Sequence, residues 1–226
     1  SVILGGRMSS WKTFSAYTAP YVVSDDRRYD GEFTPYVGVA YALGESLSAY
    51  ASYTEIFNPA NDKDVNGRLL DPESGKNHEL GLKGEWFDGR LNASAAVFQT
   101  RKDNLAVEDG NNTTPDGDQA YRAESNTKGR GWELEVAGEP LRGLQIQGGY
   151  SQFRMRDSAG ARLNTGTPIR QLKLYVSYRP AALPRLTVGG GLRWQSSTYA
   201  DWVDPAVRPA YTLHDYAVAN LHASYE

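Results

Sequence analysis

The chain has 226 residues and a formal net charge of −3, with 40% hydrophobic and 23% charged residues, 23 glycines, 15 tyrosines and no cysteine. This composition excludes collagen, low-complexity disordered chains and disulfide-stapled secreted scaffolds. It also excludes helical membrane spans, since no run of about 18 apolar residues occurs, and a basic nucleic-acid footprint. The first residues, SVIL, show neither a charged segment nor a small-residue cleavage site, so we expect no export signal and a chain that begins inside a strand of a longer protein.

Apolar and polar residues alternate with period two along most of the chain, and helical periodicity is nearly absent. His78, Leu80 and Leu82, for example, alternate with Glu79 and Lys83. The first segment, from 2 to about 17, is strand-like in composition, but its pattern does not fix which residues share a face. The alternating segments, about ten strands with the first one included, lie at 36–43, 47–54, 77–86, 91–97, 132–137, 144–150, 172–178, 186–194 and 217–225.

The connections between these segments alternate in length. Short connections are predicted near 44–46, 88–89, 140–143 and 180–185. Long polar connections are predicted near 18–34, 58–76, 106–119, 155–168 and 200–210. Neighbouring strands therefore form hairpins, and all the long connections lie at one end of the sheet. This segregation is typical of bacterial outer-membrane barrels, which have short periplasmic turns and longer extracellular loops.

The two faces of the predicted strands differ in chemistry. One face carries Leu, Val, Ala, Tyr and Trp, while the other mixes small residues with Lys, Glu, Gln and Arg. We expect the apolar face to contact lipid and the mixed face to line a wet or plugged lumen. A soluble all-β domain with a conventional core is the alternative. Aromatic residues near strand ends fit an interfacial girdle: Tyr41, Trp86, Tyr150, Tyr178, Trp194 and Tyr225.

Several segments carry a family resemblance. Residues 50–59 read YASYTEIFNP, a strand that ends in an aromatic residue and a proline, and residues 70–83 read LDPESGKNHELGLK. GRGWELE follows at 129–135, and further matching segments lie at 86–92, 168–171 and 186–191. In order and spacing these segments resemble the barrel of TonB-dependent outer-membrane receptors. They are most similar to the subgroup that imports ferric hydroxamate-type siderophores, such as ferric coprogen, alcaligin and pyoverdine receptors.

The resemblance implies an all-β fold, a transmembrane antiparallel β-barrel of 22 strands in the bacterial outer membrane, with an N-terminal plug. Residues 1–226 are then a partial TonB-dependent receptor β-barrel domain of about ten strands. We expect the plug, the TonB box, the first half of the barrel and its last strands to lie outside this chain. The edges at Val2 and Tyr225 need partners, because unpaired backbone groups are unfavourable in lipid, unless the chain is an excised fragment.

The function implied by the resemblance is active import of a ferric siderophore, energised through TonB, with no enzymatic activity. The siderophore carries the iron, so neither a cofactor nor a protein metal ligand is expected. The expected partners are the ferric siderophore, the TonB complex through the plug, and outer-membrane lipid or lipopolysaccharide, but no nucleic acid. The alternatives are a passive porin or autotransporter-type barrel and a soluble, calcium-dependent carbohydrate-binding β-sandwich.

A siderophore site needs aromatic faces for the organic skeleton and basic groups for the oxygens around the metal. Loop or girdle packing is the alternative for every candidate. The candidates near the loop ends are Tyr21, Tyr29, Tyr121, Arg122, Tyr199 and Trp202. The polar wall residues that we expect to face the plug are Lys83, Glu85, Glu133, Glu135 and Arg193.

Two further features of the sequence, an EF-hand-like segment and three histidines, are weak indications of metal binding. Residues 62–67 with Glu73 match an EF-hand loop, whose ligands require flanking helices, whereas here strands flank the segment. We therefore predict a polar extracellular loop, with calcium binding as the alternative. His78, His214 and His222 lack metal-ligand spacing and are expected to be wall residues.

Overall fold

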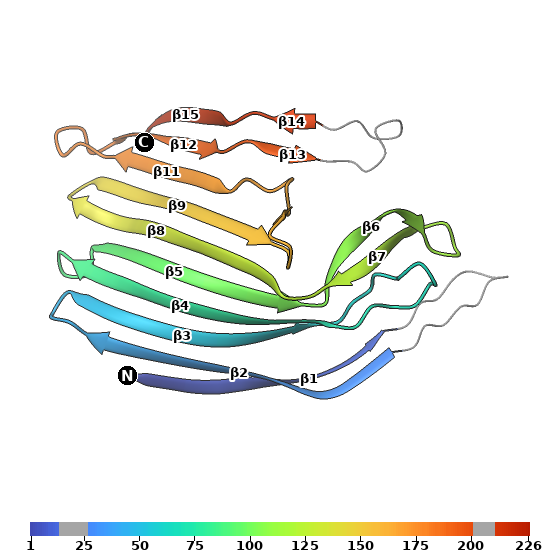
Figure 1. The fold of residues 1–226 in the computed structure, drawn as a ribbon. Coiled ribbons are helices and arrows are strands. Elements are labelled where there is room, and N and C mark those ends of the chain that lie inside the picture. Colours follow the sequence, from blue (N-terminus) through green and yellow to red (C-terminus); the bar gives the residue numbers. More distant parts are fainter. Residues whose placement is uncertain (14–26, 201–210) are drawn as a thin grey trace.

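The computed structural model describes residues 1–13, 27–200 and 211–226, and these residues form strands and connections without a helix. Accordingly, none of the described segments supplies a helix with the length and apolarity needed to cross a bilayer. The strands are β1 (Val2–Thr13), β2 (Arg27–Ala42), β3 (Leu47–Asn58), β4 (Glu73–Trp86), β5 (Leu91–Asp103), β6 (Leu105–Thr113), β7 (Gln119–Glu124), β8 (Thr127–Leu141), β9 (Leu144–Arg156), β10 (Arg162–Leu163), β11 (Arg170–Tyr178), β12 (Leu186–Gln195), β13 (Thr198–Ala200), β14 (Tyr211–Leu213) and β15 (Tyr216–Tyr225) (Figure 1).

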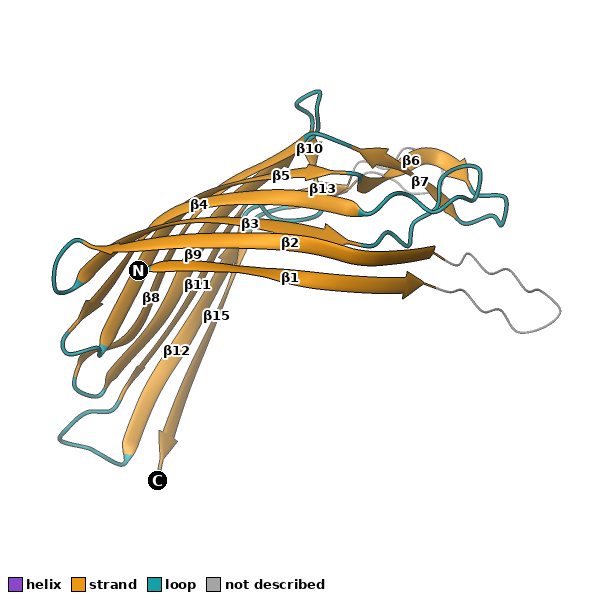
Figure 2. Cartoon of the chain, turned by 90° about the horizontal axis from the view of Figure 1, so that it is seen from below, coloured by secondary structure: helices purple, strands orange, loops and turns teal. Residues whose placement is uncertain are grey.

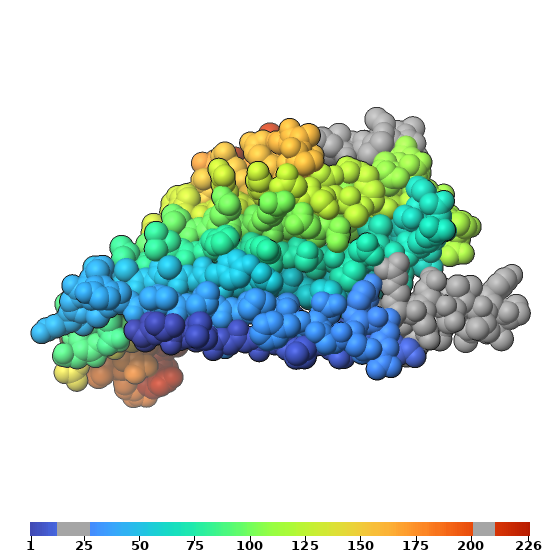
Figure 3. Space-filling model, turned by 60° about the horizontal axis from the view of Figure 1, so that its bottom comes forward, coloured from blue at the N-terminus to red at the C-terminus, as the bar shows by residue number. Residues whose placement is uncertain are grey.

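One antiparallel sheet dominates the fold. Its strand order is β1-β2-β3-β4-β5-β8-β9-β11-β12-β15, with the short β10 paired to β9. Ten strands thus follow the main path, as the alternation predicted. β6 with β7 and β13 with β14 form two small separate sheets. Figure 3 shows β1 to β5 side by side in one continuous surface, and Figure 2 shows that both ends of the chain lie near the end where the short turns lie.

Connection lengths segregate as predicted among the described residues. The short turns at 43–46, 87–90, 142–143 and 179–185 lie at one end of the sheet, and the longer connections lie at the other (Figure 1). The turn after β4 shows how the sequence fixes a short connection. Asp88 and Gly89 both have positive φ, and the Arg90 N–H donates to the Phe87 carbonyl at 3.3 Å. This is the type I′ geometry that matches strand twist and favours Asp-Gly.

Several predicted loops turn out to contain strand. β2 begins at Arg27 and β4 at Glu73, inside segments predicted as loops at 18–34 and 58–76. β6 and β10 likewise lie within the predicted loops 106–119 and 155–168. At 73–76 and 108–113 the paired residues are polar on both faces, so the alternation disappears although backbone pairing continues. The hydropathy pattern therefore predicted only the middle part of each strand, where one face is apolar and the other polar. In β2 the alternation does extend to Tyr29 and Phe33, so this part of the strand could have been predicted.

The register also settles which residues of β1 share a face. Val2 lies opposite Val39 and Leu4 opposite Val37, so the even-numbered apolar residues of β1 join the apolar face of β2. The register of β1 against β2 shifts between Ser9 and Trp11. The pattern alone did not resolve this phase, because Gly, Met and Ser interrupt it.

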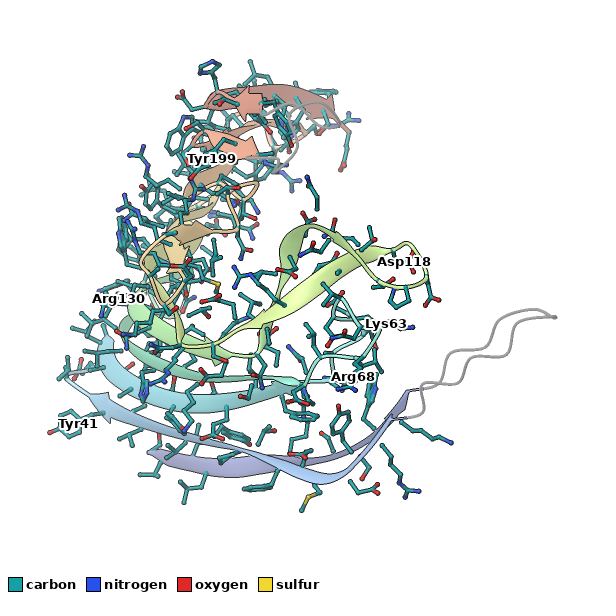
Figure 4. All side chains as sticks on the ribbon, turned by 45° about the vertical axis from the view of Figure 1, so that its right-hand side comes forward. Tyr41, Lys63, Arg68, Asp118, Arg130 and Tyr199 are labelled. Atoms are coloured by element: carbon teal, nitrogen blue, oxygen red, sulfur yellow. The ribbon has the colours of Figure 1, made fainter. Side chains whose placement is uncertain are left out.

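The sheet curves, and its convex face is apolar and open. Figure 4 shows Tyr41 and Arg130 projecting from the convex side, while the β6–β7 hairpin lies on the concave side. Leu82, Leu134 and Leu174 are 44%, 47% and 39% exposed. No second layer covers them within the described residues, so the structure does not support a soluble all-β domain with a conventional core. An apolar face of this kind needs a lipid environment.

Candidate functional site

The concave face carries charged and hydrogen-bonding side chains from neighbouring strands. Register places Lys83 of β4, Glu135 of β8 and Arg193 of β12 in one cross-strand row, with Lys173 of β11 directly opposite Arg193. Glu133 lies two residues from Glu135 and therefore on the same face. A hollow of about 730 Å³ is lined by residues of this wall, including Glu133, Glu135, Lys173 and Arg193. The wall thus presents both signs of charge to whatever occupies the concave space.

Tyr50 orders one part of this wall. Its hydroxyl donates a 2.7 Å hydrogen bond to Glu79 Oε1, and Lys83 Nζ lies 4.9 Å from the centroid of its ring. The ring covers Gly81, where a Cβ atom would come within 2.4 Å of it. A side chain at position 81 would therefore have to displace the Tyr50 ring. Glu85 lies further toward the short-turn end and is exposed.

A stacked Tyr–His pair lies at the other end of the same face. The rings of Tyr175 and His222 are parallel to within 4°, with centroids 5.8 Å apart, and the tyrosine hydroxyl lies 3.3 Å from His222 Nε2. The ring of His78 instead packs against that of Tyr53, with centroids 5.0 Å apart. His214 lies in the link between β14 and β15. No group of three or more potential metal-ligating side chains occurs in the described ranges.

At the long-loop end, the β6–β7 hairpin is joined to the β3–β4 connection. The Tyr121 N–H donates to the Lys63 carbonyl at 2.8 Å, and Lys63 Nζ lies 3.7 Å from Asp116 Oδ2. Burial, followed by the nearby Asp62 and Glu108 carboxylates, raises the pKa of Tyr121. Tyr121 therefore has a neutral, half-buried ring, and its backbone is bonded to the β3–β4 connection.

Arg122 lies beside Tyr121 and is engaged by an acidic neighbour. Its NH1 atom lies 2.5 Å from Glu124 Oε2, and the Ser158 hydroxyl donates to Glu124 Oε1 at 3.0 Å. The bonds from Arg122 and Ser158 hold the pKa of Glu124 below its usual value. Because Ser158 belongs to the β9–β10 connection, a second long loop is linked to the hairpin.

The remaining loop-end candidates have separate surroundings. The guanidinium of Arg162 lies over the ring of Tyr199 in β13, and the distance from Arg162 Cζ to the ring centroid is 5.1 Å. Tyr29 of β2 makes an edge-to-face contact with Phe57, with centroids 5.7 Å apart. Tyr21 and Trp202 lie outside the described residues. The structure thus places all four described candidates at the long-loop end on three separate hairpins, with Tyr121 and Arg122 together on β7.

Sequence reasoning missed Arg162 and Lys63. Arg162 supplies a cation to Tyr199, and Lys63 connects two loops. Both lie in segments predicted as polar loops, where no periodic pattern exists to indicate a side chain's direction. The pairing of a basic residue with a distant tyrosine has no signal in a single sequence.

The EF-hand-like loop is organised around backbone hydrogen bonds. Asp64 Oδ1 accepts the N–H groups of Asn66 and Arg68, both at 2.9 Å. The hydrogen bond from the Arg68 N–H is the larger cause, and that from Asn66 the smaller, of a lowered pKa of Asp64. Glu73 is the first residue of β4 and lies 2.6 Å from Lys102 Nζ. The two carboxylates therefore have different protein partners in this structure.

The fold and faces together define a class. An antiparallel sheet with an apolar convex face, a polar concave face and segregated short and long connections is a wall of an outer-membrane β-barrel. Residues 1–226 match the family model described as TonB dependent receptor-like, beta-barrel, and the chain belongs to this family. It is thus part of a receptor of the bacterial outer membrane.

Curated relatives match over most or all of the chain. The ferripyoverdine receptor of Pseudomonas aeruginosa is 38% identical over 235 residues, which covers 100% of this chain and 28% of that receptor. The ferrioxamine B receptor of Salmonella typhimurium is 29% identical over 185 residues, covering 79% of this chain and 26% of that receptor. The chain thus spans little more than a quarter of these relatives' length.

Solved structures show the same fold. The crystal structure of the P. aeruginosa outer-membrane ferripyoverdine receptor bound to ferripyoverdine aligns with a TM-score of 0.84 at 38% identity, covering 100% of this chain and 30% of that one. The alcaligin outer-membrane receptor FauA from Bordetella pertussis aligns with a TM-score of 0.71 at 36% identity, covering 99% of this chain and 41% of that one.

Proposed function

We propose that this chain is part of the barrel wall of an active importer of a ferric siderophore, of the hydroxamate-containing type, and is not an enzyme. One observation carries the proposal. A wall with the two-faced chemistry described above is 38% identical, over its whole length, to a receptor named for ferripyoverdine. The relatives named for ferrioxamine B and alcaligin support the same ligand class.

The loop-end chemistry suits such a ligand. Tyr121 and Tyr199 offer aromatic faces to an organic skeleton, and Arg122 and Arg162 offer guanidinium groups to the anionic oxygens around the metal. Iron is cargo in this scheme and is held by the siderophore. The contribution of these loops is to bind and orient the complex above the concave space.

The concave wall has a second role in the proposal. Lys83, Glu133, Glu135 and Arg193 would contact a plug domain supplied by the rest of the protein, through ion pairs and hydrogen bonds. The row carries both signs of charge, with Glu135 between Lys83 on one side and Lys173 and Arg193 on the other, which suits a plug surface that also carries both signs. Energy from the TonB complex would then rearrange the plug, whose wall contacts can break one at a time.

The passive porin or autotransporter-type barrel is a weaker alternative. Membership of the TonB-dependent receptor family and relatives named as receptors for ferric complexes both favour active uptake. Nothing in the described wall favours hydrolytic chemistry over contact with a plug.

The experiment is uptake of radioactive iron by iron-starved cells that carry or lack the full-length protein, tested with a panel of ferric chelates. We expect loss of uptake for one hydroxamate-containing chelate and its restoration by the full-length gene. Arg122→Ala should reduce binding of that chelate, whereas Arg142→Ala, at a short turn, should not. Normal uptake of every chelate by the deletion strain would contradict the proposal.

A further inference from the structure

The convex face carries a cluster of cations on four adjacent strands, which we name the convex cation patch. Two consecutive rows on β4, β5, β8 and β9 contribute to it, and their register places the side chains on the same side as Leu80 and Leu82. Figure 4 shows one member, Arg130, projecting from the convex side. The patch consists of Lys76, Arg101, Lys128, Arg130, Arg154 and Arg156.

The register brings like charges directly opposite one another. Side chains directly opposite in an antiparallel sheet are about 5 Å apart at Cβ, and like charges in this position are destabilising. The chain has a net charge of −3 but concentrates cations on this patch. An external anion would reduce the repulsion between them and so stabilise the wall. The opposed pairs are Lys76 with Arg101, Arg101 with Lys128, Lys128 with Arg156, and Arg130 with Arg154.

The protein itself neutralises little of this charge. Arg101 lies 3.8 Å from Asp103 and Lys76 lies 3.9 Å from Glu55, and the four side chains are between 28% and 61% exposed. Long, exposed pairs of this kind contribute little to stability. Their carboxylates also leave most of the patch unneutralised.

The other four cations have no acidic partner among the residues that the structure describes. Arg130 donates to the neutral Gln99 at 3.0 Å, and Arg156 donates to the Gly160 carbonyl. Within residues 1–13, 27–200 and 211–226, no carboxylate forms an ion pair with Lys128, Arg130, Arg154 or Arg156.

The patch adjoins the apolar band on its long-loop side. Trp132 lies two residues from Arg130 along β8, on the same face. Its ring stacks on that of Tyr150, with centroids 4.8 Å apart. Leu80 and Val97 share its row and are 59% and 55% exposed. Two residues correspond to about 7 Å along a strand. The cations therefore lie just beyond an aromatic boundary, at the depth of lipid head groups.

We propose that the convex cation patch binds the phosphate groups of an anionic lipid in the membrane leaflet that faces the long loops. Guanidinium and ammonium groups form strong charge-assisted hydrogen bonds to phosphate. Leu80, Val97 and Trp132 beneath the patch contact the acyl chains of the same molecule, so the surface fits a ligand with both parts. The inference rests on the location of the barrel in the outer membrane and is independent of which chelate is imported.

The test uses the full-length receptor in detergent, titrated with diphosphorylated lipid A and followed by native mass spectrometry. The variant K128Q/R154Q removes two cations without a described ion pair, and R90Q/R142Q removes two exposed cations at the short-turn end. We expect K128Q/R154Q to bind the lipid about tenfold or more weakly. R90Q/R142Q and the charge-conserving K128R/R154K should bind it as the wild type does.

Three results would overturn the proposal. The first is equal lipid affinity of K128Q/R154Q and the wild type. The second is loss of affinity in K128R/R154K as well, which would indicate disrupted packing instead of lost charge. The third is competition by millimolar inorganic phosphate as effective as that by the lipid, which would indicate a site for free anions. Binding of the ferric chelate, measured on the same variants, should stay unchanged, so failure here is distinguishable from failure of the transport proposal.

Discussion

The Tyr50 hydroxyl reaches diagonally across the β3–β4 pair to Glu79 Oε1 at 2.7 Å. On the concave side of β4 this bond and the nearby Lys83 make a polar, ordered surface. On the convex side of the same strand, Leu80 and Leu82 are 59% and 44% exposed. Residues next to each other in sequence thus face two different environments, and this contrast is the basis of the functional account.

Gly81→Ala should destabilise the wall, because the added Cβ would come within 2.4 Å of the Tyr50 ring and displace it from Glu79. We expect a loss of about 1–3 kcal/mol in the free energy of unfolding, measured by urea titration of the full-length receptor in lipid vesicles. Gly38→Ala is the matched control, since the nearest atom to its Cβ would be 4.0 Å away. Equal stability of the two variants would show that the Tyr50 ring is not fixed.

Leu134→Arg and Gln147→Arg introduce the same charge on opposite faces of adjacent strands. Leu134 lies on the convex face, two residues inside the boundary at Trp132, where an arginine costs about 1–3 kcal/mol, between the interfacial and midplane values. Gln147 is exposed on the concave face, where an arginine remains hydrated. Urea unfolding from vesicles should therefore separate the variants, with only Leu134→Arg destabilised. A larger loss for Gln147→Arg would reverse the assignment of the faces.

The sequence predicted the middle of the wall well. In β4 and β8 the alternation assigned each side chain to the face that the register confirms. Polar pairing at the long-loop end, at 73–76 and 108–113, escaped prediction because backbone hydrogen bonds leave no trace in hydropathy.

The candidate site was less predictable than the fold. Placing Lys83, Glu135 and Arg193 in one row requires the register of the strands between them. The contact of Arg162 with Tyr199 depends on where two separate loops fold. A single sequence reveals which residue types can bind a ligand, but it does not reveal which of them meet.

Lys102 and Glu73 form a pair, 2.6 Å apart, whose side chains are only 24% and 19% exposed. Lys102→Met leaves a largely shielded carboxylate without its cation, so we expect destabilisation of about 1–3 kcal/mol. The double variant K102M/E73Q should recover part of that loss, giving a coupling energy of about 1 kcal/mol in a double-mutant cycle of urea unfolding. Additive losses would mean that the two groups do not interact in solution.

Glu124 should make the attachment of the β9–β10 connection depend on pH. Since Arg122 and Ser158 lower the pKa of Glu124, its contribution is fully present above the unfolded value of about 4.3 and is lost as pH falls through the lower folded value. Hydrogen exchange at 157–161, corrected for intrinsic pH dependence, should stay slow from pH 8 to pH 5 and accelerate at lower pH. Glu124→Gln should remove this transition. An unchanged profile in that variant would assign the transition to another group.

The most direct test of the account asks which side chains touch lipid. This chain has no cysteine, so nitroxide labels can be attached to Leu134→Cys and Leu174→Cys on one face and to Glu135→Cys and Lys173→Cys on the other. In the full-length receptor in lipid vesicles, dissolved oxygen and lipid-borne relaxation agents should broaden the signals at 134 and 174 but leave those at 135 and 173 largely unaffected. Lipid contact at 135 and 173, or its absence at 134 and 174, would contradict the assignment of the convex face to the membrane.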